Sequence, residues 1–164
     1  MRDLDSIDLA ILGELQRDGR LSNQDLADAV GLSPSPCLRR VRRLEAEGVI
    51  TGYTALVDPT AVGLSITAFV QIRLDRHNET AIESAEAAIR EIPEVTEAFI
   101  LAGDHDYLLK ITVESFQAYE RLLKTRLRRI PALTSMDTTF AFGTTKPLTP
   151  LQVPRGDRPG PRRE

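Results

Sequence analysis

The chain has 164 residues, a net charge of −3 and a hydrophobic content of 41%, which are ordinary values for a globular protein of one or two small domains. No apolar run approaches the roughly 18 residues of a membrane span, and the acidic start MRDLDSIDLA lacks the basic and apolar regions of a signal peptide. A single cysteine, Cys37, excludes an internal disulfide framework, so we expect a soluble, cytoplasmic protein.

A first amphipathic helix is expected over residues 3–18, and Gly19 follows it as a stop signal. Its apolar positions recur at the spacing of one helical face: Leu4, Ile7, Ile11 and Leu15. Ser22 can cap a second helix, because a serine hydroxyl accepts a backbone N–H in the first turn. Gly31 suits the left-handed residue that ends this helix. The next helix follows after only a tight turn.

The third predicted helix starts at the SPSP run of residues 33–36, since proline is tolerated in a first helical turn. Leu38, Val41 and Leu44 form its predicted buried stripe. Polar side chains lie broadly opposite that stripe: Ser35, Arg39, Arg42 and Arg43. Arg40 lies to one side, where it can serve a phosphate or a carboxylate of the same domain. This division suits insertion into the DNA major groove, and an amphipathic surface helix is the alternative.

The segment after this helix is predicted to be extended. Residues 49–57 (VITGYTALV) are rich in β-forming side chains, and Asp58-Pro59 is a turn signal. The segment can serve as a wing, as a linker strand, or as a strand exchanged between subunits. We therefore divide the N-terminal part into a helix-turn-helix domain over 1–48 and a linker strand over 49–63.

From residue 64 onward the pattern predicts alternating strands and helices. The elements in order are a strand over 66–74, a helix over 80–92, strands over 95–102 and 107–113, a helix over 115–130 and a strand over 133–142. This βαββαβ order is that of the ferredoxin-like split motif, with both helices on one face of an antiparallel sheet. Phe116 is expected on the inner side of the last helix. The domain spans 64–146, and the Pro-, Gly- and charge-rich residues 147–164 are predicted to be a disordered tail.

Three stretches carry a family resemblance: LDSIDLAILGELQRDGRLSNQDLADAVGLSPSPCLRRVRRLEAEGVITGYTALVDP near the start, then GDHDYLLK and IPALTSMDTTF. Over about residues 3–146 the chain resembles the Lrp/AsnC (leucine-responsive, feast/famine) family of transcriptional regulators. The resemblance implies an α+β fold. Its parts are an N-terminal winged helix-turn-helix of three helices and a C-terminal βαββαβ ferredoxin-like (RAM) regulatory domain that binds an amino acid.

The resemblance also implies two sets of site residues. The DNA-binding set is Ser33, Ser35, Arg39, Arg40 and Arg43. The effector-binding set, in a site formed between dimers, is Ile100, Gly103, Asp104, Asp106 and Thr138. A glycine allows close backbone approach to an α-carboxylate, and an aspartate can receive an α-ammonium. The alternative is that both aspartates only shape the hairpin turn.

The family pattern further implies a nucleoid-associated homo-oligomer. Dimers would assemble into a tetramer or octamer on double-stranded DNA carrying an inverted-repeat operator, with an amino-acid effector and no membrane, metal or other cofactor. One alternative is an enzyme, because sirohaem decarboxylase subunits resemble this family and use histidines. His77, His105 and the lone cysteine form no familiar zinc set, so we expect no enzyme. A ligand-binding regulatory module without a DNA role is the third alternative.

Overall fold

The computed structural model describes residues 4–75 and 78–152. The chain divides into two compact units. Of the described residues, 4–56 and 146–152 belong to the first unit, and 57–75 and 78–145 belong to the second. Within the described ranges, no helix is long and apolar enough to cross a membrane.

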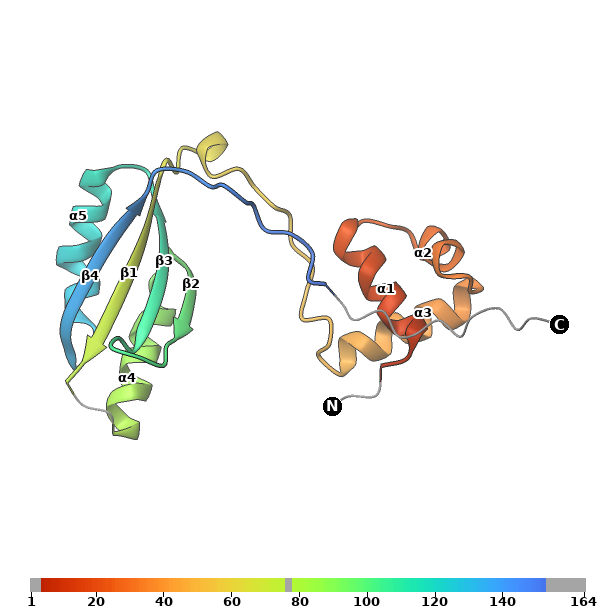
Figure 1. Ribbon diagram of the computed structural model, residues 1–164, viewed down its shortest axis with the longest axis horizontal. Helices are drawn as coiled ribbons and strands as arrows, with labels where there is room; N and C mark the ends of the chain where they lie inside the picture. The colour runs from red at the N-terminus through yellow and green to blue at the C-terminus, as the bar shows by residue number, and fades with distance from the viewer. Residues whose placement is uncertain (1–3, 76–77, 153–164) are drawn as a thin grey trace. The chain divides into compact units, whose positions relative to one another are not determined.

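The first unit contains three helices (Figure 1): α1 (Ser6–Arg17), α2 (Asn23–Val30) and α3 (Pro34–Ala46). Their ends follow the predicted signals. The Ser22 side chain accepts the Asp25 N–H, and Gly31 is left-handed with φ of 71°. α1 begins later than expected, because Asp5 is its N-cap. The buried side chains of the unit are Ile11, Leu26, Ala27, Cys37 and Leu44.

The buried stripe of α3 is rotated from the predicted one. Leu44 is fully buried and Val41 packs against the core as expected. Leu38 is 37% exposed, so its predicted place in the stripe is wrong, and the fully buried Cys37 takes that place. Positions 37, 41 and 44 share one helical face, because residues three and four apart are neighbours. The rotation turns the opposite face of α3 directly toward solvent.

The segment between the units has no regular strand. Residues 51–59 carry no strand assignment, and Thr60–Val62 form a short 3-10 turn, η1. A strand needs a hydrogen-bonding partner, so a linker strand within 49–63 would have to pair outside this chain. That strand stays a prediction.

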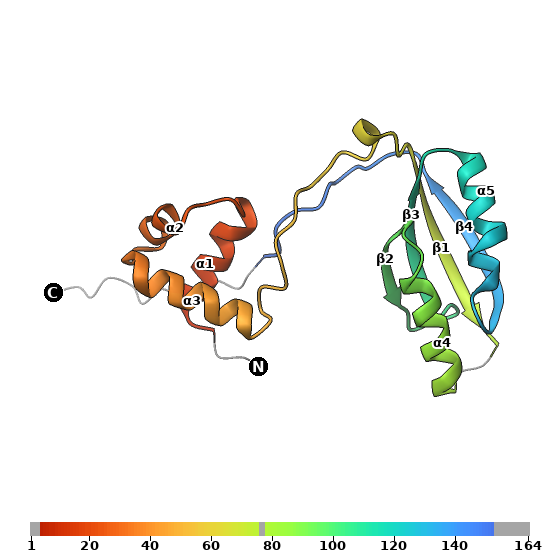
Figure 2. The same ribbon diagram turned by 180° about the vertical axis from the view of Figure 1, so that it is seen from behind.

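The second unit has the predicted βαββαβ order. Its elements are β1 (Ile66–Leu74), α4 (Glu79–Arg90), β2 (Val95–Ile100), β3 (Tyr107–Val113), α5 (Phe116–Thr125), the 3-10 turn η2 (Leu127–Arg129) and β4 (Leu133–Ala141). The strands form one sheet in the order β2-β3-β1-β4, and all neighbours are antiparallel. α4 and α5 cover the same face of the sheet, which Figures 1 and 2 show from opposite sides.

The last helix differs from its prediction in two ways. It ends at Thr125 rather than at 130, because Arg126 leaves the helical conformation (φ −127°, ψ −58°) and η2 follows. This break lets both Leu127 and Ile130 reach the core. The predicted inner position of Phe116 is also wrong, since Phe116 is 57% exposed. It is the first residue of α5, and its ring packs edge-on against Phe140 at 5.0 Å.

The face of the sheet opposite the helices carries apolar side chains. Side chains alternate between the faces of a strand, and the register places Phe69, Leu108 and Phe99 on this open face. Phe99 is 49% exposed. Beside them, Lys110 Nζ donates to Glu97 Oε1 at 2.5 Å. The open face, defined by these five residues, is not covered by α4 or α5.

Candidate functional site

α3 presents a cationic face opposite its buried stripe. Successive residues are about 100° apart around a helix, so Ser35, Arg39 and Arg42 lie on the side away from Cys37 and Leu44. All three are exposed. Within the described part of the chain, neither arginine forms a salt bridge. Their guanidinium groups are therefore available to an anionic partner such as a DNA phosphate.

The start of α3 supplies hydroxyl donors. Ser33 is the N-cap, but its side chain makes no capping hydrogen bond. Pro34 and Pro36 have no N–H, which removes two of the donors that a helix start normally offers. The hydroxyls of Ser33 and Ser35 take their place at this end of the helix. Asn23 Nδ2 donates to the Pro34 carbonyl at 2.9 Å, and this bond fixes α2 against the start of α3.

Arg40 and Arg43 are directed toward α1. Arg40 Nη1 donates to Asp8 Oδ1 at 2.8 Å and to Asp5 Oδ2 at 2.7 Å. Arg43 Nη2 donates to Asp8 Oδ2 at 2.5 Å. Hydrogen bonds to Asp8 and then Asp5 raise the pKa of Arg40 above its ordinary value. The sequence left two partners open for Arg40, a DNA phosphate or a carboxylate of the same domain. Within this chain its partners are the carboxylates of Asp8 and Asp5. Direct DNA contacts by Arg40 and Arg43 stay a prediction.

Three of the predicted effector residues are open to solvent. Ile100 ends β2 and is 75% exposed. Gly103 and Asp104 are exposed in the turn that joins β2 to β3. Gly103 has φ of 156°, a positive value that residues with a Cβ rarely adopt. These residues can face a ligand or a second subunit.

Asp106 has an internal role in the same loop. Its carboxylate accepts the Leu74 N–H at 2.7 Å, and its own N–H donates to the Ile72 carbonyl at 2.8 Å. The Leu101 N–H in turn donates to the Asp106 carbonyl at 2.8 Å. Asp106 thus holds the β2–β3 loop to the end of β1, where the pairing of β1 with β4 shifts register. These contacts favour the turn-shaping alternative for Asp106.

Thr138 lies apart from the loop within one chain. It pairs with Val70 of β1, so β1 and β3 separate it from β2. Its hydroxyl is 2.5 Å from the hydroxyl of Tyr119. The five predicted effector residues therefore do not converge in a single chain. They can meet only if another subunit contributes part of the set.

Two contacts were missed by sequence reasoning. Asp8, a plain helix residue by its spacing, is buried beneath two arginines of α3. His105 Nε2 lies 3.0 Å from Asp137 Oδ2 and links the β2–β3 loop to β4. Both join positions more than 30 residues apart, and the sequence gives no local signal for such pairs. His77 lies outside the described residues, and the described ones form no cluster of metal-ligating side chains.

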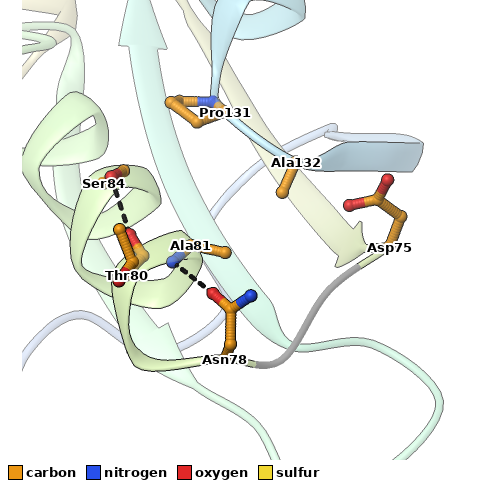
Figure 3. A pocket seen from close by; sticks show the side chains of 7 residues that line it. All are labelled: Asp75, Asn78, Thr80, Ala81, Ser84, Pro131 and Ala132. Carbon is orange, nitrogen blue, oxygen red and sulfur yellow. Dashed lines mark hydrogen bonds between the residues drawn. The ribbon is translucent and has the colours of Figure 1, made fainter.

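A pocket of 410 Å³ lies where the end of β1, the start of α4 and the start of β4 meet (Figure 3). It is lined by Asp75, Asn78, Thr80, Ala81, Ser84, Pro131 and Ala132. Asn78 Oδ1 accepts the Ala81 N–H, and Ser84 Oγ donates to the Thr80 carbonyl. None of the predicted effector residues lines this pocket, so it is distinct from the β2–β3 loop.

Comparison with known families matches both units. A winged helix-turn-helix DNA-binding family matches residues 4–51, and an Lrp/AsnC ligand-binding domain family matches residues 67–151. A helix-turn-helix unit followed by a ligand-binding βαββαβ unit defines a DNA-binding transcriptional regulator. The chain belongs to the Lrp/AsnC family.

Individual relatives agree with this assignment. The chain is 47% identical over 152 residues to the leucine-responsive regulatory protein of Salmonella typhimurium, covering 93% of each. A Neisseria meningitidis transcriptional regulator, solved with L-methionine, is 36% identical with a TM-score of 0.83 and covers 91% of this chain and 96% of that one. An AsnC family regulator of Agrobacterium tumefaciens is 37% identical with a TM-score of 0.83 and covers 90% and 95%. The predicted family and fold class are confirmed.

Proposed function

We propose that this regulator binds operator DNA as a homo-oligomer through α3 and that an amino acid bound by its C-terminal unit changes this binding. The exposed face of α3 carries the proposal. It places small hydroxyl side chains at the helix start and, further along, arginines that form no salt bridge with any described residue, opposite a stripe in which Cys37 and Leu44 are fully buried. Small polar groups fit against base edges in the major groove, and arginines reach phosphates or guanine.

The predicted DNA contacts are supported to different degrees. Ser33, Ser35 and Arg39 are exposed and free to approach the groove. Arg40 and Arg43 are partly exposed and bound to Asp8. A DNA contact by Arg40 or Arg43 would have to use an N–H that its carboxylate partners leave over, since a guanidinium has five donors.

The open face of the sheet supports the proposed oligomer. Phe69, Leu108 and Phe99 form an apolar surface that a second copy of the same face can bury. A two-fold dimer presents two α3 helices to half-sites about one helical turn apart, which requires an inverted-repeat operator. Further assembly into a tetramer or octamer would add avidity from linked sites.

The effector is proposed to be an amino acid bound between dimers at the β2–β3 loop. The related Neisseria regulator was solved with L-methionine, and Ile100, Gly103 and Asp104 are exposed here. Asp104 can receive an α-ammonium, and the loop backbone can donate to an α-carboxylate. The ligand can shift assembly or DNA binding only through its different affinities for the two states.

A regulatory rather than enzymatic role, in the cytoplasm at the nucleoid, completes the proposal. The similar proteins with names are transcriptional regulators, which supports it. Purified protein should show no Soret absorbance. A bound tetrapyrrole would instead favour the sirohaem decarboxylase alternative.

DNA binding is tested by the salt dependence of affinity. Arg39→Ala should lower the slope of log K against log salt by about 0.9 for each α3 that engages DNA. Arg121→Ala, an exposed arginine of the C-terminal unit, removes the same charge and should leave the slope unchanged. Equal effects of the two substitutions would contradict groove binding by α3.

Effector binding is tested by a thermal-shift screen of amino acids. A ligand at 100 times its dissociation constant stabilises the folded state by roughly 2.7 kcal/mol. Asp104→Asn should abolish the shift produced by the active amino acid. If no amino acid shifted the melting temperature and light scattering showed no change of assembly, the proposed amino-acid effector would be refuted. The proposal that α3 binds DNA would not be affected by that result.

A further inference from the structure

We propose that Asp8 is a positioning residue that selects which arginines of α3 contact DNA. It holds Arg40 and Arg43 against α1, and it leaves Arg39 and Arg42 as the phosphate-contacting pair. The inference rests on the proposed binding of DNA by α3. It adds Arg42 to the contact residues and gives α1 a part in DNA recognition.

The Asp8 carboxylate is buried and fully engaged. Its side chain is 1% exposed, and each of its two oxygens accepts from a different arginine of α3. A buried carboxylate without partners is strongly unfavourable. Moving either arginine away would leave the buried Asp8 carboxylate without one of its partners, which costs free energy. Both arginines therefore stay on Asp8 and do not turn toward a DNA phosphate.

A capping box at the start of α1 fixes the direction of the Asp8 side chain. The Asp5 N–H donates to Asp8 Oδ2 at 3.2 Å, and the Asp8 N–H donates to Asp5 Oδ1 at 2.9 Å. Asp5 also accepts from Arg40. The two acids thus form one rigid acceptor set at the N-terminal end of α1, directed at α3.

The helical geometry of α3 separates the four arginines into two pairs. Arg39 lies within about 15° of the direction opposite the buried stripe, and Arg42 lies roughly 50° to one side of that direction. Arg43 and Arg40 lie on the other side, toward α1, at roughly 50° and 115°. Among the described residues, carboxylates engage only the second pair. The ion pairs and the directions around α3 therefore give the same two pairs of arginines.

This arrangement has a measurable electrostatic consequence. Each arginine that neutralises a phosphate contributes about 0.9 to the salt slope of DNA binding. In the native protein, Arg39 and Arg42 should each contribute this amount per engaged helix. Arg40, which pairs with Asp8 and Asp5, and Arg43, which pairs with Asp8 and Glu47, should contribute little. Freeing them should raise affinity for any duplex and weaken discrimination between sequences, because phosphate contacts carry no sequence information.

The first test replaces Asp8 in the full-length protein and measures binding to a short mixed-sequence duplex across a salt series. Asp8→Asn should steepen the slope by at most about 1.8 per engaged α3, because it removes one of the two carboxylates that pair with Arg40 (Asp8 and Asp5) and with Arg43 (Asp8 and Glu47). Glu14→Gln is the matched control: it lies on the same helix, removes the same charge and releases Arg17 of α1 instead. Glu14→Gln should leave the slope near its native value.

The second test removes the arginines in both backgrounds. Arg40→Ala combined with Arg43→Ala should change the native slope little, yet it should cancel the added slope of Asp8→Asn. Arg42→Ala should lower the native slope by about 0.9 per engaged helix. If circular dichroism shows that Asp8→Asn does not fold, the native background still tests the proposal. There, Arg42→Ala should lower the salt slope and Arg40→Ala should not.

Distinct outcomes separate the two proposals. Equal slope losses for Arg40→Ala and Arg42→Ala would overturn the selection by Asp8, as would a folded Asp8→Asn protein with an unchanged slope. If no arginine of α3 affects the slope, the proposed DNA-binding mode itself fails. A purely structural role for Asp8 predicts lower thermal stability with no change in slope.

Discussion

Asp106→Ala offers a sharp test of how the effector loop is held. Its carboxylate accepts the N–H of Leu74, a residue in the core of the C-terminal unit. Hydrogen bonds to a charged acceptor contribute about 1.5–3 kcal/mol, and a buried donor left unpaired costs a similar amount. We therefore expect Asp106→Ala to lower the free energy of unfolding of this unit by about 1.5–3 kcal/mol.

The assay uses tyrosine fluorescence in a urea titration, since the chain has three tyrosines and no tryptophan. Tyr107 and Tyr119 are buried in the second unit, and a Tyr53→Phe background removes the signal of the first unit. Asp104→Ala is the matched control, because Asp104 is exposed in the same turn. Its effect should stay within about 0.5 kcal/mol.

The opposite pattern would refute this account of the loop. If Asp106→Ala left stability unchanged but abolished the thermal shift by the active amino acid, Asp106 would be a direct ligand contact. If Asp106→Ala and Asp104→Ala destabilised the unit equally, the hydrogen bond from the Leu74 N–H to Asp106 would not be the source of the loss. Asp106→Asn keeps an acceptor without the charge, so it should fall between Asp106→Ala and the native protein.

Three further outcomes are expected for the first unit. Leu44→Ala should destabilise it by about 2–5 kcal/mol and Leu38→Ala by less than about 1 kcal/mol in thermal melts, because Leu44 is fully buried and Leu38 is not; equal losses would contradict the observed rotation of α3. Burial alone would raise the pKa of Asp5, but hydrogen bonds, including one from Arg40, outweigh it and lower that pKa. The stabilisation by Asp5 is therefore present above its unfolded pKa and is lost as pH falls through its folded pKa, below about pH 4. In thermal melts at a series of pH values, Asp5→Asn should make the melting temperature depend less on pH in that range. Cys37 is fully buried, and burial also raises the pKa of its thiol. A thiol reagent should therefore label it only at the unfolding rate, and rapid labelling of native protein would show that the site opens.

The sequence was sufficient for the order and nature of the elements. β1 and β3 have the bounds that their alternating apolar residues predict, because side-chain alternation is a property of the strand itself. Ser22 and Gly31 mark the ends of α2 as expected, because caps are satisfied by residues within a few positions. The GDHDYLLK motif and the N-terminal stretch were enough to assign the family.

The tertiary structure decided which functional groups are free. A wheel projection placed the arginines of α3 around the helix, but the partners of Arg40 and Arg43 lie 32 and 35 residues away on α1. Only packing determines such a pair, because the carboxylate must be buried beside the helix before it can hold an arginine. Likewise the sequence could not show that Asp106 holds Leu74 while Asp104 stays exposed. The sequence by itself determined the DNA-binding and ligand-binding units, and three-dimensional packing determined which of their side chains can reach a partner.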